Sequence, residues 1–388
     1  MPARLFPPTF LWGAATAAHQ TEGNNVGSDW WAREVAPGSP LAEPSGDADD
    51  GFHRYPQDIA LLAGSGLTTY RFSIEWARIE PAEGMISRAA LAHYARMIDC
   101  CHAHGVTPLV TLHHFSSPLW FEASGGWRDP RSTERFVRYV EAVLPILRPH
   151  VQHVITINEP NILAMLATFA KGDEQLAADA LPAPDAEVSD ALTAAHRAVT
   201  GLIRAAGLQV GWSVAPQQLW ADPGAEDVLR EYAYPRETRF LEAAREDDFV
   251  AVQAYSRTRI TLDGPVQPPE GTELTLTGWE YYPPAIAEAV QLAWDLTGRP
   301  VLVSENGIAT ADDARRIDYT RDALLALHAV IEAGVPVLGY LHWSLLDNYE
   351  WGSYAPTFGL VAVDRSTFER TPRPSLAYLG GVARANGL

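Results

Sequence analysis

The segment VITINEP, residues 154–160, joins a short run of apolar and β-branched residues to a polar end that closes with proline. The segment VLVSENG, residues 301–307, repeats this arrangement and closes with glycine. Short apolar runs that stop at turn residues are typical of fully buried strands in a parallel sheet. Each segment therefore predicts a buried strand with a glutamate, Glu159 or Glu305, just past its end.

Runs of the same kind recur along the chain and alternate with segments of helical periodicity. Several of these segments end at a glycine directly before the next strand, for example Gly105, Gly207 and Gly334, as αβ loops prefer. The expected strands cover residues 11–14, 68–72, 106–112, 153–157, 210–214, 249–254, 301–303 and 337–341. The expected helices cover residues 55–64, 88–104, 133–147, 190–206, 284–296 and 318–333.

Eight strands alternating with helices predict an α/β fold, and we expect a single (β/α)8 TIM barrel that spans residues 1–388 as one domain. A doubly wound open sheet is the structural alternative. Its glycine-rich phosphate-binding turn is absent, because residues 23–27 read GNNVG after the first strand. Loops are expected at residues 37–51, 171–187 and 263–278.

The composition excludes several classes of protein. The 388 residues include 29 basic and 48 acidic side chains, a formal net charge of −19, which argues against nucleic acid or an anionic membrane as a partner. No run approaches the ~20 apolar residues of a membrane-spanning helix, and residues 1–10 lack the pattern of a signal peptide. The adjacent Cys100 and Cys101 predict no disulfide framework, which favours a cytoplasmic location. A homo-oligomer is compatible with this composition.

Hydrolysis of a glycosidic bond typically requires two carboxyl groups that meet in one cleft. The C-terminal ends of the strands of a barrel meet at one face, so we expect Glu159 and Glu305 to lie there together. One carboxylate must stay ionised near the anomeric carbon, while the other must keep a proton for the leaving oxygen. A single glutamate of this kind is equally well explained by helix capping or by an ion pair.

The chain resembles glycoside hydrolase family 1, the β-glucosidase family, along nearly its whole length. The motifs that match follow one another in the family's order. They are FLWGAATAAHQTEG (10–23), YRFSIEWARI (70–79), TLHHF (111–115), TINEP (156–160), SENG (304–307) and WSLLDNYEW (343–351). The resemblance implies a (β/α)8 barrel, no metal or organic cofactor, and a small β-glycoside or oligosaccharide as substrate.

The implied reaction is hydrolysis of terminal nonreducing β-D-glucosyl residues with retention, through a covalent glycosyl-enzyme; galactosyl and fucosyl residues are also compatible. By position, Glu305 matches the family's nucleophile, and Glu159 matches the general acid that later acts as base. Arg71 matches the residue whose charge keeps Glu305 ionised. Tyr255 matches the hydroxyl that orients it. Retention requires the two carboxyl groups to lie about 5–5.5 Å apart.

Further positions match the family's sugar-binding residues. Trp343 is expected to stack on the sugar and Asn158 to contact its 2-hydroxyl. Glu350 argues against a 6-phosphoglycosidase, because a carboxylate beside C6 would repel a phosphate. The hydroxyl-binding residues implied in this way are Gln20, His114, Asn158, Gln253, Glu350 and Trp351.

Some positions depart from the family pattern. Gln253 stands where the family usually has asparagine, which changes its reach by one methylene. His113, Phe115 and Ser116 replace a frequent tyrosine, tryptophan and aspartate, which affects the wall of the cleft more than the reaction. Residues 161–184 are unlike the family segment that follows the NEP motif, and this loop borders the leaving-group side of the site.

Three other functions share parts of the pattern. A transglycosidase would use the same intermediate, with an alcohol or sugar in place of water. A noncatalytic β-glycoside-binding barrel would not need two carboxylates of unequal pKa. A metal-dependent barrel hydrolase would need a ligand cluster, but His102 and His104 are expected at a helix end on the opposite rim. The neighbours His113 and His114 are expected to point to opposite faces of a strand, so we expect no metal site.

Overall fold

The computed structural model describes residues 4–148, 150–170 and 182–388. Eight parallel strands of this part close into a barrel, which confirms the predicted (β/α)8 fold. The order of the strands around the barrel is β1-β11-β10-β7-β5-β4-β3-β2. Their bounds are β1 (Leu11–Ala15), β2 (Thr69–Ser73), β3 (Thr107–His113), β4 (His153–Asn158), β5 (Gln209–Val214), β7 (Val250–Gln253), β10 (Val301–Asn306) and β11 (Val337–Trp343).

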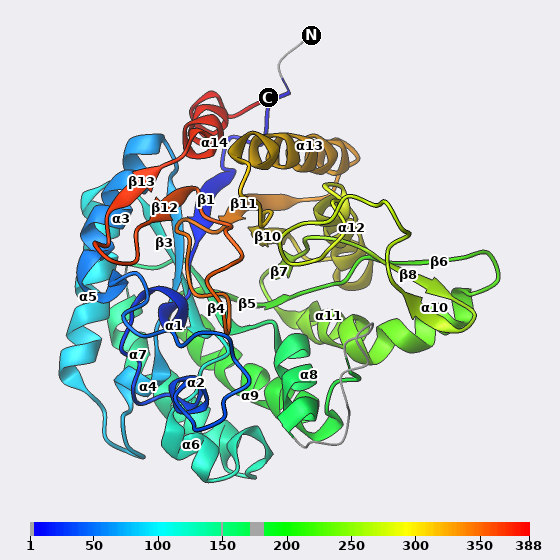
Figure 1. Ribbon diagram of the computed structural model, residues 1–388. Helices are drawn as coiled ribbons and strands as arrows, with labels where there is room; N and C mark the ends of the chain where they lie inside the picture. Colours follow the sequence, from blue (N-terminus) through cyan, green and yellow to red (C-terminus); the bar gives the residue numbers. More distant parts are fainter. Residues whose placement is uncertain (1–3, 149, 171–181) are drawn as a thin grey trace.

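Helices surround the barrel (Figure 1). The longer ones are α3 (Gly51–Ser65), α5 (Arg88–Ala103), α7 (Ser132–Leu147), α8 (Pro160–Ala170), α9 (Ala186–Ala205), α12 (Ala285–Thr297), α13 (Asp313–Glu332) and α14 (Pro374–Ala385). The shorter ones are α1 (Ala18–Thr21), α2 (Asp29–Glu34), α4 (Trp76–Ile79), α6 (Leu119–Ala123), α10 (Glu226–Ala233) and α11 (Arg239–Ala243). The chain also forms 3-10 turns η1 (Gly126–Arg128) and η3 (Ala244–Glu246) and the π-helical turn η2 (Tyr234–Thr238).

Several predicted helices begin earlier than their hydrophobic periodicity indicates, and capping explains two of them. The helix α13 begins at Asp313 rather than at 318, because the Asp312 side chain accepts a hydrogen bond from the Ala314 amide. The helix α9 begins at Ala186 rather than at 190, because Asp185 caps the Val188 amide in the same way. An aspartate at this position satisfies an otherwise unpaired helix N–H group and so sets the boundary.

The expected loops are partly wrong. The range 263–278 contains β9 (Gly264–Val266), which joins β6 (Leu219–Ala221) and β8 (Thr258–Thr261) in a three-stranded sheet. The last residues of the expected loop 171–187 belong to α9, and residues 171–181 lie outside the described residues. A two-stranded sheet is formed by β12 (Val361–Val363) and β13 (Arg370–Pro372). Strands of three or four residues carry too little periodicity to be recognised in a sequence.

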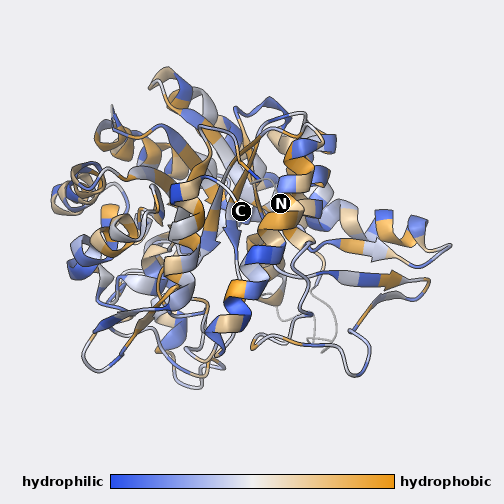
Figure 2. Cartoon of the chain, turned by 90° about the horizontal axis from the view of Figure 1, so that it is seen from above, coloured by the Kyte–Doolittle hydropathy of each residue, from blue (hydrophilic) through white to orange (hydrophobic). Residues whose placement is uncertain are grey.

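The core has two layers because successive strand residues point to opposite faces. In β10, Leu302 packs inside the barrel with Ile155 and Leu341. Its neighbours Val301 and Val303 belong to the larger cluster between the barrel and the helices. Figure 2 shows this arrangement from above, with apolar residues on the strands and on the inner sides of the helices.

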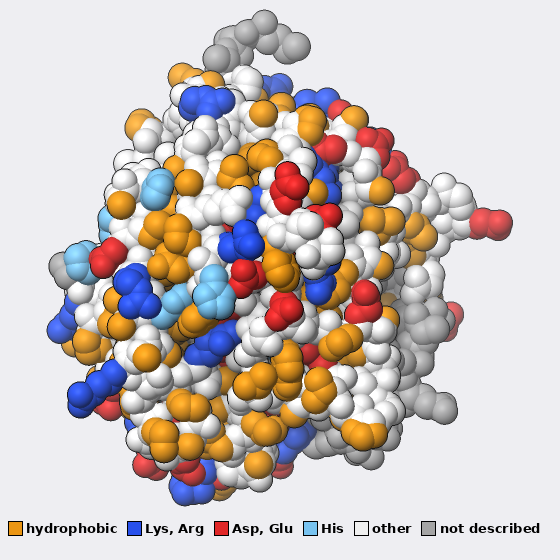
Figure 3. Space-filling model, turned by 60° about the vertical axis from the view of Figure 1, so that its left-hand side comes forward, with side chains coloured by type: hydrophobic (Ala, Val, Ile, Leu, Met, Phe, Trp, Pro, Cys, Tyr) orange, Lys and Arg blue, Asp and Glu red, His pale blue; other side chains and the backbone are white. Residues whose placement is uncertain are grey.

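The surface is acidic overall, and the face drawn in Figure 3 carries acidic and basic side chains side by side. Neither sign forms one continuous patch on that face. Among the described residues, no helix combines the length and the apolar character that crossing a bilayer requires.

Candidate active site

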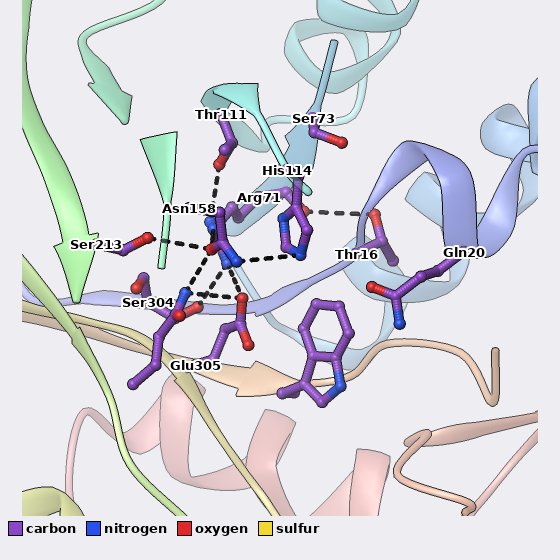
Figure 4. A network of polar contacts seen from close by, with 12 residues as sticks. Thr16, Gln20, Arg71, Ser73, Thr111, His114, Asn158, Ser213, Ser304 and Glu305 are labelled. Carbon is purple, nitrogen blue, oxygen red and sulfur yellow. Dashed lines mark hydrogen bonds and ion pairs between the residues drawn. The ribbon is translucent and has the colours of Figure 1, made fainter. Parts of the chain in front are cut away.

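The predicted catalytic residues meet at the C-terminal ends of the barrel strands. Glu305 lies within β10, which continues to Asn306, so the prediction that it follows the end of its strand was wrong. Its side chain is 4% exposed, and Arg71 lies on β2 and is fully buried. Arg71 points into the barrel because its neighbours Tyr70 and Phe72 belong to the outer core cluster. Its Nη1 donates a hydrogen bond to Glu305 Oε1 across the barrel (Figure 4).

Two further side chains donate to Glu305, and both come from β7 or the residues that follow it. Gln253 Nε2 donates to Oε1 at 2.7 Å, and the Tyr255 hydroxyl donates to Oε2 at 2.5 Å. Each donor favours the ionised carboxylate over the neutral acid. Glu305 therefore has three donors among the described residues, one of which carries a full positive charge.

Asn158, the last residue of β4, is held by two of the same donors. Its Oδ1 accepts from Arg71 Nη2 at 2.5 Å and from Gln253 Nε2 at 2.8 Å. Ser213 Oγ on β5 donates to the same oxygen at 3.1 Å. Arg71, Glu305, Gln253 and Asn158 thus form a closed ring of hydrogen bonds, which fixes the position of the carboxylate.

Glu159 follows Asn158 and has a left-handed backbone with φ of +44°, which is uncommon for a residue with a side chain. Its amide donates to the Ser213 carbonyl at 2.8 Å, which holds this conformation in place. No side chain in the described part of the chain donates a hydrogen bond to its carboxyl group. Glu159 therefore has none of the support that the ionised form of Glu305 receives.

The pKa values of the two glutamates differ for this reason. Burial raises the pKa of Glu305, but the Arg71 charge and the Tyr255 hydroxyl pull it back toward its ordinary range. Burial also raises the pKa of Glu159, and the nearby Glu305 charge raises it further, to well above the ordinary value. As the pH rises, Glu305 loses its proton first and Glu159 keeps its own.

Gln20, Trp343 and Glu350 form one polar side of the site. Trp343 Nε1 donates to Glu350 Oε1 at 3.0 Å, and Gln20 Nε2 donates to Glu350 Oε2 at 3.3 Å. Burial raises the pKa of Glu350 to about 8, although these two donors oppose the shift. Gln20 Oε1 is buried and has no partner among the described residues, so it can still accept a hydrogen bond.

His114 and Trp351 continue this side as a series of parallel rings. The His114 ring stacks with Trp343 at 5.9 Å and with Trp351 at 6.0 Å between centroids. Asn158 Nδ2 lies 3.2 Å from His114 Nε2, which must accept the hydrogen bond because an amide nitrogen can only donate. Burial holds the pKa of His114 well below its ordinary value, so the ring is neutral and its proton is on Nδ1.

The structure therefore brings together all the residues predicted for the site. Glu159, Glu305, Arg71 and Tyr255 cluster with Asn158 and Gln253, and Gln20, His114, Trp343, Glu350 and Trp351 line the adjoining side. Within the described residues, no group of three or more His, Cys, Asp or Glu side chains is arranged to hold a metal ion. His102 lies in the last turn of α5, as expected.

Comparisons with known proteins give one consistent answer. The model of glycosyl hydrolase family 1 matches residues 3–261 and 257–388 of this chain. The thermostable beta-glucosidase B of Thermobispora bispora is 34% identical over 99% of this chain and 91% of its own length. The bifunctional beta-D-glucosidase/beta-D-fucosidase of Bifidobacterium breve is 30% identical over 96% of each chain. The solved family 1 β-glucosidase of Thermotoga maritima superimposes with a TM-score of 0.92 at 26% identity and covers 100% of both chains.

The chain belongs to glycosyl hydrolase family 1. This confirms the resemblance seen in the sequence motifs, and the predicted glycoside hydrolase activity with it. The structure of the Thermotoga maritima enzyme matches this chain along its whole length.

Three residues that support the site were not predicted, although signals for two of them were present. Thr111 Oγ1 accepts from Arg71 Nε at 3.0 Å and lies in the TLHHF motif. Asn348 Oδ1 accepts from Gln20 Nε2 at 3.0 Å and lies in the WSLLDNYEW motif. Ser213, which donates to Asn158, is the second-last residue of β5 and lies in no motif, so the sequence carries no signal for it.

Proposed function

We propose that this family 1 hydrolase is a retaining β-glucosidase with Glu305 as nucleophile and Glu159 as general acid and base. One observation carries the proposal: the two carboxyl groups share a site but have opposite environments. Three donors favour the ionised form of Glu305, while burial and the charge of Glu305 keep the proton on Glu159. A retaining glycosidase needs this division between its two acids.

In the first step, Glu305 attacks the anomeric carbon and forms a bond to it while the bond to the leaving oxygen breaks. Glu159 gives its proton to that oxygen, so the leaving group departs as a neutral alcohol or sugar. Glu159 is then ionised and takes a proton from water, whose oxygen attacks the same carbon. Glu305 leaves as a carboxylate and the sugar is released with its original configuration.

Sugar recognition follows from polar atoms that still need partners. Gln20 Oε1 and Gln253 Oε1 are buried acceptors, and His114 Nδ1 is a buried donor, and none of the three has a partner among the described residues. Hydroxyl groups of a glycosyl residue both donate and accept, so they satisfy such atoms. Trp343 offers an aromatic face for the sugar ring, and Asn158 offers its amide to the 2-hydroxyl.

Neutral hexosides fit this site better than phosphorylated ones. Glu350 lies between Trp343 and Gln20, and its carboxyl group can exchange hydrogen bonds with sugar hydroxyls. Where the pH is high enough to ionise it, Glu350 would also repel a phosphate. Glucosyl residues are the proposed main substrates. Fucosyl residues are a further option, since the Bifidobacterium breve relative is named for both activities.

The test is hydrolysis of 4-nitrophenyl β-D-glucoside, followed by ¹H NMR of the first product formed. We expect β-glucose to appear first and to mutarotate later. Glu305→Gln should lower kcat by at least about 10³-fold, since the covalent step is lost. An α-anomer as first product would overturn the retaining mechanism, and full activity of Glu305→Gln would overturn the assignment of the nucleophile.

We also propose that residues 1–388 act as one domain in the cytoplasm. Both cysteines are free, and Cys101 is fully buried in α5, which suits a reducing compartment. A single calorimetric unfolding transition and recovery of the activity in the soluble cytosolic fraction would support this. Two separate transitions, or activity confined to the secreted fraction, would contradict it.

A further inference from the structure

The two carboxylates divide the barrel into two arcs. Glu159 follows β4 and Glu305 lies on β10, so one arc holds β3, β2, β1 and β11, and the other holds β5 and β7. The proposed sugar-binding side comes from the first arc. Its members are Gln20 after β1, His114 after β3, Trp343 on β11, and Glu350 and Trp351 after β11. A leaving group that Glu159 protonates therefore extends away from this arc, toward β5 and β7.

The sheet β6-β8-β9 grows from the second arc. The strand β5 ends at Val214 and β6 begins at Leu219, while β7 ends at Gln253 and β8 begins at Thr258. Both connections leave from the C-terminal ends of barrel strands, the face that carries the site. Figures 1 and 2 show this sheet and α10 projecting sideways from the barrel.

One face of this sheet carries an exposed indole beside two arginines. Trp220 on β6 pairs with Arg259 on β8, so their side chains share a face, and Arg257 lies two residues before Arg259 on the same face. The Arg257 and Arg259 guanidinium carbons lie 5.4 and 5.5 Å from the Trp220 ring centroid. The opposite face holds Ile260, which is fully buried.

The indole has a side that the sheet does not cover. Both arginines approach from the β8 side, and β6 is the edge strand of the sheet. Trp220 is 40% exposed, a large fraction for a tryptophan. An exposed aromatic side chain of this kind is a candidate for binding rather than for packing.

The two arginines are held in place by carboxylates. Arg259 donates to both oxygens of Asp222 at 2.7 and 2.6 Å, and Arg257 donates to both oxygens of Glu280 at 3.0 and 2.8 Å. Two positive and two negative charges give this face no net charge. Fixed guanidinium donors and carboxylate acceptors next to an indole suit the hydroxyls and the apolar ring face of a neutral sugar.

The segment between β9 and α12 connects this face with the catalytic site. Glu280, which pairs with Arg257, follows Trp279 in the chain, and Trp279 is 44% exposed. The Trp279 ring lies 5.5 Å from Tyr255, whose hydroxyl donates to Glu305. Side-chain contacts thus join Glu305 to Trp279 through Tyr255, and the next residue, Glu280, contacts Arg257 beside Trp220.

We propose that Trp220, Arg257 and Arg259 form a distal surface that binds the leaving-group sugars of a neutral β-linked gluco-oligosaccharide of three or more residues. This rests on the proposed β-glucosidase function and names its substrate class. A disaccharide leaves one sugar beyond the cleaved bond, close to Tyr255 and Trp279. Trp220 lies farther out along the sheet, so a longer chain is needed to reach it.

The test compares kcat/KM on cellotetraose and laminaritetraose with kcat/KM on 4-nitrophenyl β-glucoside. Trp220→Ala should lower the tetrasaccharide-to-aryl ratio about tenfold for at least one of the two linkages, and Trp220→Phe should restore most of the loss. Leu262→Ala is the matched control, since Leu262 is 70% exposed in the turn after β8 and lies outside this face. Its ratio should equal that of the wild type.

Three results would overturn the proposal. A Trp220→Ala ratio equal to that of the wild type would show that the surface is not used, and an equal loss on both substrates would indicate a structural role for the indole. A loss specific to octyl β-glucoside would assign the surface to alkyl groups instead. The proposed function fails separately, and this inference with it, if the wild type does not hydrolyse 4-nitrophenyl β-glucoside.

Discussion

Gln253 donates its side-chain N–H to Glu305 Oε1 at 2.7 Å, so it contacts the proposed nucleophile directly. The same amide nitrogen lies 2.8 Å from Asn158 Oδ1. The sequence placed Gln253 among the sugar-binding residues. Its geometry adds a positioning role, because a neutral donor to a buried carboxylate both orients the group and favours its ionised form.

Replacing Gln253 by methionine, a side chain of similar length without a hydrogen-bond donor, should change the pH profile of the activity. Gln253→Met removes one hydrogen bond to the Glu305 carboxylate, which costs about 1.5–3 kcal/mol for a charged acceptor. We expect kcat/KM to fall by about tenfold or more, and its acidic limb to move to higher pH because Glu305 ionises less readily. The pH dependence of kcat/KM on 4-nitrophenyl β-glucoside measures this shift.

Tyr255→Phe is the matched comparison, since it removes the donor to the other oxygen of Glu305. Both variants should move the acidic limb in the same direction. A Gln253→Met profile with an unchanged acidic limb and a raised KM would mean that this residue serves the sugar alone.

The sequence predicts the barrel and the identity of its site residues because both leave strong local signals. Most of the barrel strands contain a short run of apolar or β-branched residues, and Glu305 and Glu159 stand within two residues of the ends of two such runs. Arg71 lies between Tyr70 and Phe72, and an isolated arginine flanked by core residues has to point inward with a partner. Each of these features lies within one short segment of the chain, so it can be recognised from the sequence.

The sequence does not predict how the two glutamates come to face each other. Strict alternation in β10 would put Leu302 and Ser304 inside the barrel and Glu305 outside. The pairing of β10 with β7 changes register between Val303 and Glu305, and β4 pairs irregularly with β5 between Ile155 and Asn158. Such irregularities re-aim side chains, and they arise from pairing between distant segments that no local pattern records.

The role of Glu159 can be tested with leaving groups of different acidity. Glu159→Gln removes the proton that an unactivated leaving oxygen needs, so hydrolysis of cellobiose should fall by about 10²–10⁴-fold. Formation of the covalent intermediate from 2,4-dinitrophenyl β-glucoside should fall much less, since this leaving group departs without protonation. Rapid-mixing measurements of the released phenolate separate the two cases.

The pH profile gives an independent check on this assignment. The wild type should lose activity at high pH as Glu159 loses its proton, because the pKa of Glu159 is raised well above its ordinary value. In Glu159→Gln this basic limb should disappear. Equal losses on both substrates, with the basic limb retained, would contradict the role of Glu159 as acid.

Glu350 should make the stability of the protein depend on pH. Burial raises its pKa to about 8 in the folded state, while an unfolded glutamate titrates near 4.3. Between these values the folded state binds more protons than the unfolded state, so the stability falls as the pH rises. The contribution is fully present below about pH 4 and lost progressively up to about pH 8.

Glu350→Gln cannot titrate and should lack this loss. The two pKa values correspond to a loss of about 4 kcal/mol between pH 5 and pH 8. This is about 4–5 °C in a chain of this size, so the Tm of the variant relative to the wild type should rise by that amount over this range. Scanning calorimetry at several pH values measures it. A Tm difference that stays constant over this range would show that Glu350 is already ionised in the folded protein.

A buried hydrogen bond between His19 and Glu34, behind the sugar-binding side, should support Trp351. His19 Nε2 lies 2.7 Å from Glu34 Oε1, and both side chains are fully buried. The His19 ring stacks on Trp351 at 5.6 Å with an interplanar angle of 6°. Although burial opposes it, the hydrogen bonds from His19 and Ser45 lower the pKa of Glu34, so this carboxyl is ionised.

Removing His19 takes one hydrogen-bond donor from the buried, ionised Glu34 carboxylate, which costs about 1.5–3 kcal/mol for a charged acceptor. We expect His19→Ala to lower the free energy of unfolding by that amount in urea denaturation. The variant should also raise KM for 4-nitrophenyl β-glucoside more than it lowers kcat, because it frees Trp351 without touching Glu305 or Glu159. Glu34→Gln keeps the shape of the pair and removes its charge, so its loss of stability should be smaller. A loss of stability for Glu34→Gln as large as that of His19→Ala would contradict this expectation, because it would show that the charge of Glu34 rather than the packing of the His19 ring holds Trp351 in place.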